Sequence, residues 1–364
     1  MTPLCHFNLV IMNNPLRPTL IFFLLVLAMC TPKQGDNPEN QQDAVVQNGE
    51  VNVYTHRHYP SDQILFEKFT ENTGIQVNVV NASADELINR MEMEGDASAA
   101  DVLITVDAGR LNRAMEKGLL QPVQSATLES NIPRNFRENQ GHWFGLTYRA
   151  RIIAYSLDRV DPAAISDYED LTDPKWKSKV LIRSSENIYN QSLMASIIAN
   201  EGPEQAKTWA AGVVANMARE PKGSDRDQVK AVAAGEGDLA ILNTYYVGLL
   251  LNSENPEEVA AGESVGIIFP NQQGRGTHIN VSGAGVARYA PNKENAVKFI
   301  EFLSSDEAQK VFAEANFEFP VKPGTTRAPL LESWGSFKID TLDLGQLGTY
   351  NRQAVMLFDE VGWK

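Results

Sequence analysis

Residues 148–155 read Tyr148-Arg-Ala-Arg-Ile-Ile-Ala-Tyr155, a long and largely apolar stretch that is typical of a buried strand. A second extended stretch, His278-Ile-Asn-Val-Ser-Gly-Ala-Gly-Val286, lies much further along the chain. Strand and helix signals alternate before the first stretch and again between the two. We therefore predict two α/β units, with one strand crossing out of the first unit and another crossing back.

The segment before the first crossing predicts an α/β unit with a largely parallel sheet. Strands are expected at Val51–Thr55, Ile75–Val79 and Asp101–Thr105. Apolar residues at helical spacing predict a helix over Ser61–Asn72, and Ser83–Glu86 forms a capping box that opens the next helix.

The segment between the crossings predicts the second unit. It contains a short strand at Lys179–Ile182, helices over Gln191–Glu201 and Gly202–Met217, and an apolar strand that ends near Thr244. The fold class that these elements imply is α/β, and it resembles the two-lobed type II periplasmic-binding-protein fold with two crossover strands at the hinge. In that architecture the lobes close on a ligand that is held by loops from both sides.

These positions predict how the chain is divided. Lobe 1 is expected to comprise residues 49–147 plus 280–320, and lobe 2 residues 148–279. The C-terminal segment, residues 321–364, is expected to pack on the lobes.

Residues 1–30 read as a signal peptide, because their apolar region is too short to span a bilayer comfortably. Leu27–Cys30 resembles a lipobox, although Met29 departs from the small residue expected before the cysteine. Lipid attachment at Cys30 and ordinary cleavage both stay open. Residues 31–48 are polar and free of aromatic residues, which predicts a disordered tether. We expect a periplasmic or extracytoplasmic protein. If Cys30 carries a lipid, the protein is anchored through that residue.

Composition excludes several classes of function. The two cysteines are Cys5 and Cys30, so no disulfide is expected in the mature chain. The formal net charge of −14 argues against a nucleic-acid partner and against tight binding to anionic lipid. The chain has no P-loop, dinucleotide-binding or His-Glu-x-x-His motif, so we expect no enzyme.

Four tyrosines stand just after predicted strands, where three loops are expected to converge on one cleft. They are Tyr59, which follows His58, then Tyr189, and the adjacent pair Tyr245-Tyr246. Four phenols and an imidazole are an unusual set for a hydrophobic core, because each buried hydroxyl needs a hydrogen-bond partner. The same set suits a hard, highly charged cation that prefers anionic oxygen, and Fe³⁺ is such a cation.

The energy of deprotonation narrows the choice of metal. A free phenol has a pKa near 10, so deprotonating it at neutral pH costs about 4 kcal/mol, and four phenols cost roughly 16 kcal/mol. A strong Lewis acid is needed to offset that, which favours Fe³⁺ over Ca²⁺, Mg²⁺ or Zn²⁺. Zinc would also prefer cysteine and histidine at a spacing that this chain lacks.

Five stretches, read together, resemble the ferric-binding-protein family, including its FutA-like members, which are the iron-binding components of ABC transporters. The stretches are Tyr54-Thr-His-Arg-His-Tyr59, Asp101–Leu111, Ser185–Gln191, Asn243-Thr-Tyr-Tyr246 and Ser282–Val286. The resemblance covers the chain from about Val51 to Val321 in the same order.

The resemblance implies a set of iron ligands, in which a histidine adds a fifth donor to four tyrosines: His58, Tyr59, Tyr189, Tyr245 and Tyr246. The alternative for His58 is that it only caps or solvates its loop. Arg149 matches a basic residue that lies beside the metal in members of this family. It would balance the one negative charge that four phenolates leave on Fe³⁺, so that no synergistic anion is needed.

Three further expectations concern charged neighbours of this set. Of Arg149 and Arg151, one is expected to face the cleft and the other solvent. Some relatives carry a second arginine shortly after the tyrosine pair, where this chain has Val247–Leu249. Asp107 and Arg110 are expected on solvated faces.

The function implied is capture of Fe³⁺ in an interlobe cleft and its delivery to a membrane ABC permease with its ATPase. We expect a monomer that contacts the membrane only where Cys30 carries a lipid anchor. Two alternatives stay open: a binding protein of the same fold for a small organic ligand such as a polyamine or a sugar phosphate, and an iron-sensing lipoprotein.

Overall fold

The computed structural model describes residues 49–364. The predicted signal peptide, the candidate lipobox at Cys30 and the tether over 31–48 lie outside the described residues. Within 49–364 the strands form one nine-stranded sheet with the order β2-β1-β3-β8-β4-β6-β5, and β7 and β9 both pair with β4.

Seven of the described strands follow the predicted pattern closely, whereas β7 and β9 were not predicted. In chain order they are β1 (Glu50–Thr55), β2 (Gln76–Asn81), β3 (Val102–Thr105), β4 (Phe144–Ser156), β5 (Val180–Leu181), β6 (Leu239–Asn243), β7 (Val265–Ile268), β8 (Ile279–Val286) and β9 (Phe319–Pro320). As predicted, β1 pairs in parallel with both β2 and β3.

The helices lie between these strands. They are α1 (Pro60–Thr73), α2 (Ala84–Glu94), α3 (Ala108–Glu116), α4 (Ala126–Asn131), α5 (Ile188–Glu201), α6 (Pro203–Asn216), α7 (Asp225–Ala233), α8 (Thr244–Leu251), α9 (Pro256–Glu263), α10 (Lys293–Leu303), α11 (Asp306–Asn316), α12 (Pro329–Ser333), α13 (Gln346–Thr349) and α14 (Asn351–Val361).

The predicted capping box is present, because the Ser83 hydroxyl accepts from the Glu86 amide at 3.3 Å and the Glu86 carboxylate accepts from the Ser83 amide at 2.9 Å.

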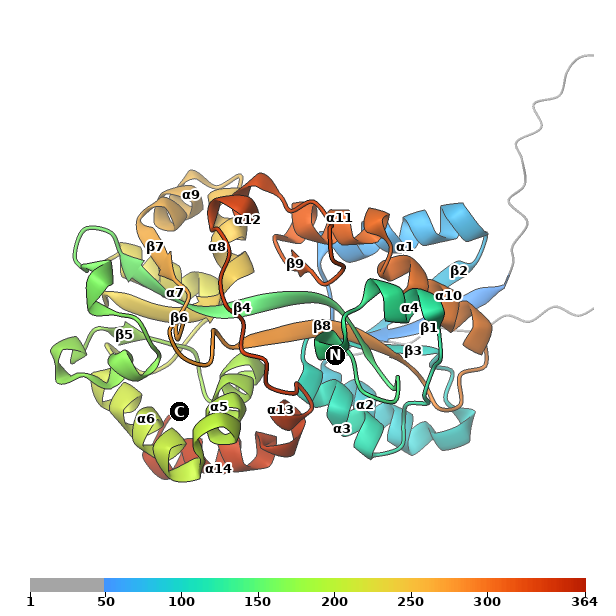
Figure 1. Cartoon of the computed structure of the whole chain (residues 1–364), viewed down its shortest axis with the longest axis horizontal. Helices are drawn as coiled ribbons and strands as arrows, with labels where there is room; N and C mark the ends of the chain where they lie inside the picture. The colour runs from blue at the N-terminus through green and yellow to red at the C-terminus, as the bar shows by residue number, and fades with distance from the viewer. Residues whose placement is uncertain (1–48) are drawn as a thin grey trace, which may run out of the picture. The chain divides into compact units, whose positions relative to one another are not determined.

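Strand β4 carries the stretch that predicted two units, and it joins the two halves of the sheet. Its first part, residues 144–150, pairs antiparallel with β8, whereas residues 151–156 pair with β6 and β7. Figure 1 shows β4 and β8 running side by side through the middle, with α1, α2 and α10 around one half of the sheet and α5 to α9 around the other. The crossing strands are therefore where the sequence predicted them.

The C-terminal helices contact both halves. Helix α13 packs against α3 in the first half and against α5 in the second, and α14 packs against α5 and α6. The approach to α3 is close, because a Cβ atom on Gly348 would lie 2.9 Å from the carbonyl oxygen of Gly109. A residue with a side chain would not fit at Gly348 without a shift of backbone.

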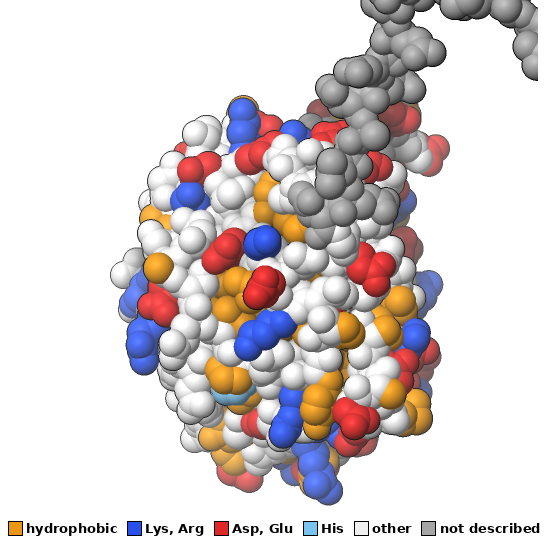
Figure 2. All heavy atoms as spheres, turned by 90° about the vertical axis from the view of Figure 1, so that its right-hand side faces the viewer, with side chains coloured by type: hydrophobic (Ala, Val, Ile, Leu, Met, Phe, Trp, Pro, Cys, Tyr) orange, Lys and Arg blue, Asp and Glu red, His pale blue; other side chains and the backbone are white. Residues whose placement is uncertain are grey.

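The surface seen in Figure 2 carries acidic and basic side chains interspersed with small hydrophobic groups. Among residues 49–364, none of the helices combines the length and apolar character that a bilayer crossing requires.

Candidate metal centre

The predicted tyrosines lie at the starts of three helices. Tyr59 is the N-cap residue of α1, Tyr189 is the second residue of α5, and Tyr245 and Tyr246 are the second and third residues of α8. The loop assignment of the last three was wrong, since their helices begin earlier than the apolar pattern indicated. For α5 the reason is local, because the Asn187 side chain caps the helix by accepting from the Tyr189 amide at 3.1 Å.

This placement has an electrostatic consequence. Side chains in a helix tilt toward its N-terminus, and that end carries a positive partial charge. Tyr189, Tyr245 and Tyr246 all lie in a first helical turn, so a phenolate there is in a favourable field.

The structure brings the four phenols together. The Tyr245 hydroxyl is at the centre, 3.2 Å from the hydroxyl of Tyr59 and 3.2 Å from that of Tyr189. The rings of Tyr245 and Tyr246 are in contact, with centroids 4.2 Å apart. Tyr245 and Tyr189 are buried, whereas Tyr59 and Tyr246 are half-buried. Residues separated by as many as 186 positions therefore meet at one point.

His58 lies at the edge of this cluster. Its side chain is exposed and its ring stacks on that of Tyr59, with centroids 5.3 Å apart. Its Nδ1 atom is 3.4 Å from the carbonyl oxygen of His56. Among the described residues, no group of three or more His, Cys, Asp and Glu side chains is placed to hold a metal ion. The donors gathered here are therefore phenolic.

Arg149 and Arg151 both approach the cluster, and the expectation that one of them faces solvent was wrong. They are two positions apart on β4, so they share a face of the strand, and each is 1% exposed. Their guanidinium carbons lie 5.5 Å and 5.8 Å from the centroid of the Tyr189 ring. Arg151 is held by Asp225 at 2.7 Å, whereas Arg149 donates to neutral oxygens, the Val106 carbonyl and the Ser282 hydroxyl.

Two other arginines, Arg57 and Arg183, were missed from the sequence. The Arg57 guanidinium lies 4.8 Å from the centroid of the Tyr59 ring and is paired with Asp62 and Glu318 at 2.9 Å each. The Arg183 guanidinium lies 5.9 Å from the centroid of the Tyr189 ring. Arg57 stands between two histidines of the quoted motif and could have been found there, whereas Arg183 carried no signal in the sequence.

The phenols are strongly biased toward their neutral form. Burial, followed by repulsion from neighbouring phenolates, raises the pKa of Tyr59, of Tyr245 and of Tyr246. One nearby cation opposes the rise in pKa at each: Arg57 at Tyr59, Arg149 at Tyr245 and Arg183 at Tyr246. Without a bound cation these phenols are therefore protonated at neutral pH, yet each has a positive charge close by.

Comparison with known proteins identifies the family. Residues 97–339 match the family described as bacterial extracellular solute-binding proteins. The chain belongs to this family of solute-binding proteins. Members of this family are components of transport systems.

This solute-binding protein is similar along most of its length to proteins with iron-related names. It is 51% identical to Iron uptake protein A1 of Synechocystis sp. over 329 residues, which are 90% of this chain and 89% of that one. The structure of FutA (IdiA) of Trichodesmium in complex with iron and citrate is 51% identical, with a TM-score of 0.83, and covers 87% of this chain and 100% of that one.

A ferric binding protein from Campylobacter jejuni shows the same likeness. Its structure is 45% identical, has a TM-score of 0.83, and covers 86% of this chain and 100% of that one. The predicted resemblance to the ferric-binding-protein family and the predicted two-lobed type II fold are both confirmed.

Proposed function

We propose that this solute-binding protein captures Fe³⁺ between its lobes and delivers it to a membrane ABC permease with its ATPase. One observation carries the proposal: the Tyr245 hydroxyl lies within 3.2 Å of the hydroxyls of both Tyr59 and Tyr189. Phenol oxygens from three helices at one point are a donor set for a hard trivalent cation. The names of the relatives, an iron uptake protein and a ferric binding protein, support the same cargo.

In this proposal the ligands are the four tyrosines with His58 at the edge, that is, His58, Tyr59, Tyr189, Tyr245 and Tyr246. Binding displaces a proton from each phenol, and the Lewis acidity of Fe³⁺ offsets that unfavourable step. Four phenolates on Fe³⁺ leave one negative charge. Arg149 balances it, because its guanidinium is buried and no carboxylate within residues 49–364 accepts a hydrogen bond from it. We therefore expect no synergistic anion to be required.

The same proposal assigns parts of the chain to the two lobes. Residues 49–147 with 280–320 form lobe 1, residues 148–279 form lobe 2, and residues 321–364 pack on both. The contacts of α13 with α3 and with α5 support this assignment. We place the protein in the periplasm or an equivalent extracytoplasmic space, as a monomer that is either lipid-anchored at Cys30 or released by ordinary cleavage.

The proposal is tested by the visible spectrum of the purified protein. Adding Fe³⁺ as a weak chelate should produce a tyrosinate-to-iron charge-transfer band that saturates at one iron per chain. Adding Zn²⁺ should produce none, because zinc has no accessible charge-transfer state with phenolate. A colourless protein at saturating Fe³⁺ would exclude ferric capture.

Arg149→Gln should lower ferric affinity by about 10- to 100-fold, the range expected when a group that supports a metal ligand is lost. The variant removes the positive charge that opposes the raised pKa of Tyr245. Arg149→Lys keeps the charge and should keep most of the affinity. Competition with a chelator measures both. Equal losses in the two variants would mean that hydrogen bonding, and not charge, is what Arg149 supplies.

A further inference from the structure

Asp107 and Arg110 were expected on solvated faces, and the structure contradicts this. Asp107 is 0% exposed and Arg110 is 7% exposed. Asp107 follows β3 and caps α3, since its Oδ1 atom accepts from the Arg110 amide at 2.9 Å. The nearest guanidinium nitrogen of Arg110 is 4.0 Å from that same oxygen. Burying a carboxylate whose nearest cation is this far away costs free energy, so hydrogen-bond donors around the carboxylate must offset that cost.

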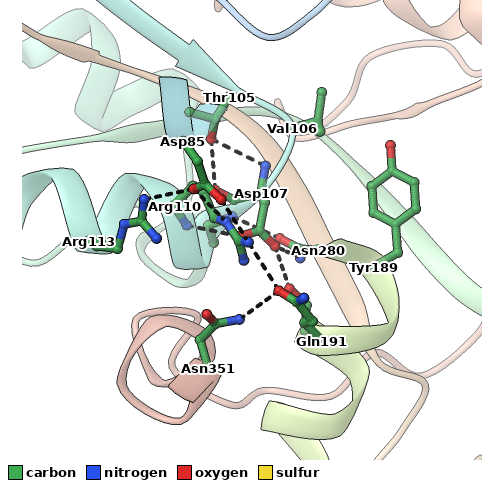
Figure 3. A network of polar contacts seen from close by, with 12 residues as sticks. Asp85, Thr105, Val106, Asp107, Arg110, Arg113, Tyr189, Gln191, Asn280 and Asn351 are labelled. Carbon is green, nitrogen blue, oxygen red and sulfur yellow. Dashed lines mark hydrogen bonds and ion pairs between the residues drawn. The ribbon is translucent and has the colours of Figure 1, made fainter. Parts of the chain in front are cut away.

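The second oxygen of Asp107 receives those donors from elsewhere in the fold. Its Oδ2 atom accepts from the Ser192 hydroxyl on α5 and from Asn280 Nδ2 on β8, the latter at 2.6 Å. Ser192 lies three residues after Tyr189, so the two side chains share one face of α5. Figure 3 shows Asp107 between Arg110 of α3 and the first turn of α5, and Tyr189 projects from that first turn of α5.

A second contact joins the same two helices. Arg110 Nη2 donates to Gln191 Oε1 at 3.0 Å, and Asn351 Nδ2 from α14 donates to the same oxygen at 3.2 Å. Asp85 holds the other side of the Arg110 guanidinium at 3.3 Å. Gln191 is therefore bound to Arg110 (Figure 3), and its neighbour Ser192 is bound to Asp107, so both contacts join α5 to the start of α3.

We infer that Asp107 is a positioning residue for the metal centre, acting through Ser192. The hydrogen bond fixes the rotation and the axial position of the first turn of α5, so that the Tyr189 hydroxyl meets that of Tyr245. Because α3 and α5 belong to different lobes in the proposed division, this contact forms on closure and prolongs the closed, loaded state. The inference rests on the proposed function.

The test compares Ser192→Ala with Ser196→Ala. Ser196 lies one turn further along α5 and is equally buried, but its hydroxyl has no hydrogen-bond partner in the described part of the chain. Ser192→Ala should release Fe³⁺ to a chelator about tenfold faster than wild type, the loss expected for a hydrogen bond to a charged group. Its charge-transfer band should also shift, because Tyr189 is no longer held in place. Ser196→Ala should match wild type in both measurements.

Stability of the metal-free variants separates positioning from a merely structural role. If the bond forms on closure, the metal-free Ser192→Ala variant should melt at the temperature of Ser196→Ala. Equal release rates for the two variants would overturn the inference. The inference would also be overturned if Ser192→Ala lost as much free energy of unfolding in the metal-free state as it lost free energy of iron binding. A wild-type protein with no charge-transfer band would instead overturn the proposed function itself.

Discussion

Tyr245→Phe should lower the affinity for Fe³⁺ by more than about 100-fold. Loss of a group that only orients a metal ligand already lowers affinity by about 10- to 100-fold, and this substitution removes an anionic ligand outright. Tyr245 is also the residue whose hydroxyl contacts two other phenols, so Tyr59 and Tyr189 lose a partner at the same time. The ring is kept, so its contact with Tyr246 should survive. Chelator competition followed at the charge-transfer band measures the change.

Tyr148→Phe is the matched control. Tyr148 is a buried tyrosine on β4 that stacks between Phe136 and Phe319, with ring centroids 5.1 Å and 5.0 Å away. It precedes Arg149 on the strand, so it points to the opposite face from the arginines that approach the cluster. Its substitution should leave iron binding unchanged. If Tyr245→Phe and Tyr148→Phe bind iron equally well, the cluster is not the ferric site.

Mild acidification should release the iron while the protein stays folded. Burial raises the pKa of Tyr59, Tyr245 and Tyr246, so these phenols are protonated in the metal-free protein at neutral pH and must lose protons to bind. With four phenols, apparent affinity should fall by up to about four orders of magnitude for each unit of pH.

The direction of each pKa shift explains why the protein stays folded on mild acidification. A phenol whose pKa is raised by folding stabilises the folded state below its unfolded pKa near 10, and that contribution is lost only as the pH rises above it. Acidification therefore leaves the contribution of these phenols intact. Burial, the largest single cause, would raise the pKa of Glu318, but the charge and hydrogen bonds of Arg57, together with Arg149 and Asn316, outweigh it and lower the pKa below the usual 4.5. Its stabilisation is present above pH 4.5 and lost only below that value.

The measurement is a titration of the charge-transfer band from about pH 8 to about pH 4, with far-ultraviolet circular dichroism recorded on the same samples. The band should disappear before the helical signal changes. A band that persists across this range, or one that is lost only together with the helical signal, would contradict a site dominated by phenolates.

The sequence alone determined the elements of the fold and the identity of the phenols. The pattern of apolar residues within a short stretch is a local property of the sequence. It predicted strands β1 to β4 because it can be read without knowing what each strand packs against. Tyr59, Tyr189 and the Tyr245-Tyr246 pair could be singled out because each follows a strand or an apolar run. The capping box at Ser83 and Glu86 was equally local.

Only the tertiary structure decided the charges around the phenols and the contacts that hold them. Arg183 reaches Tyr189 from the segment after β5, and the Arg57 guanidinium meets Glu318, which is 261 positions away in the chain. Asp107 read as a surface residue because a carboxylate is rarely buried. The fold buries it because three donors, from α3, α5 and β8, are brought to its two oxygens. Such donors are assembled by the packing of distant segments, which the local pattern of a sequence does not encode.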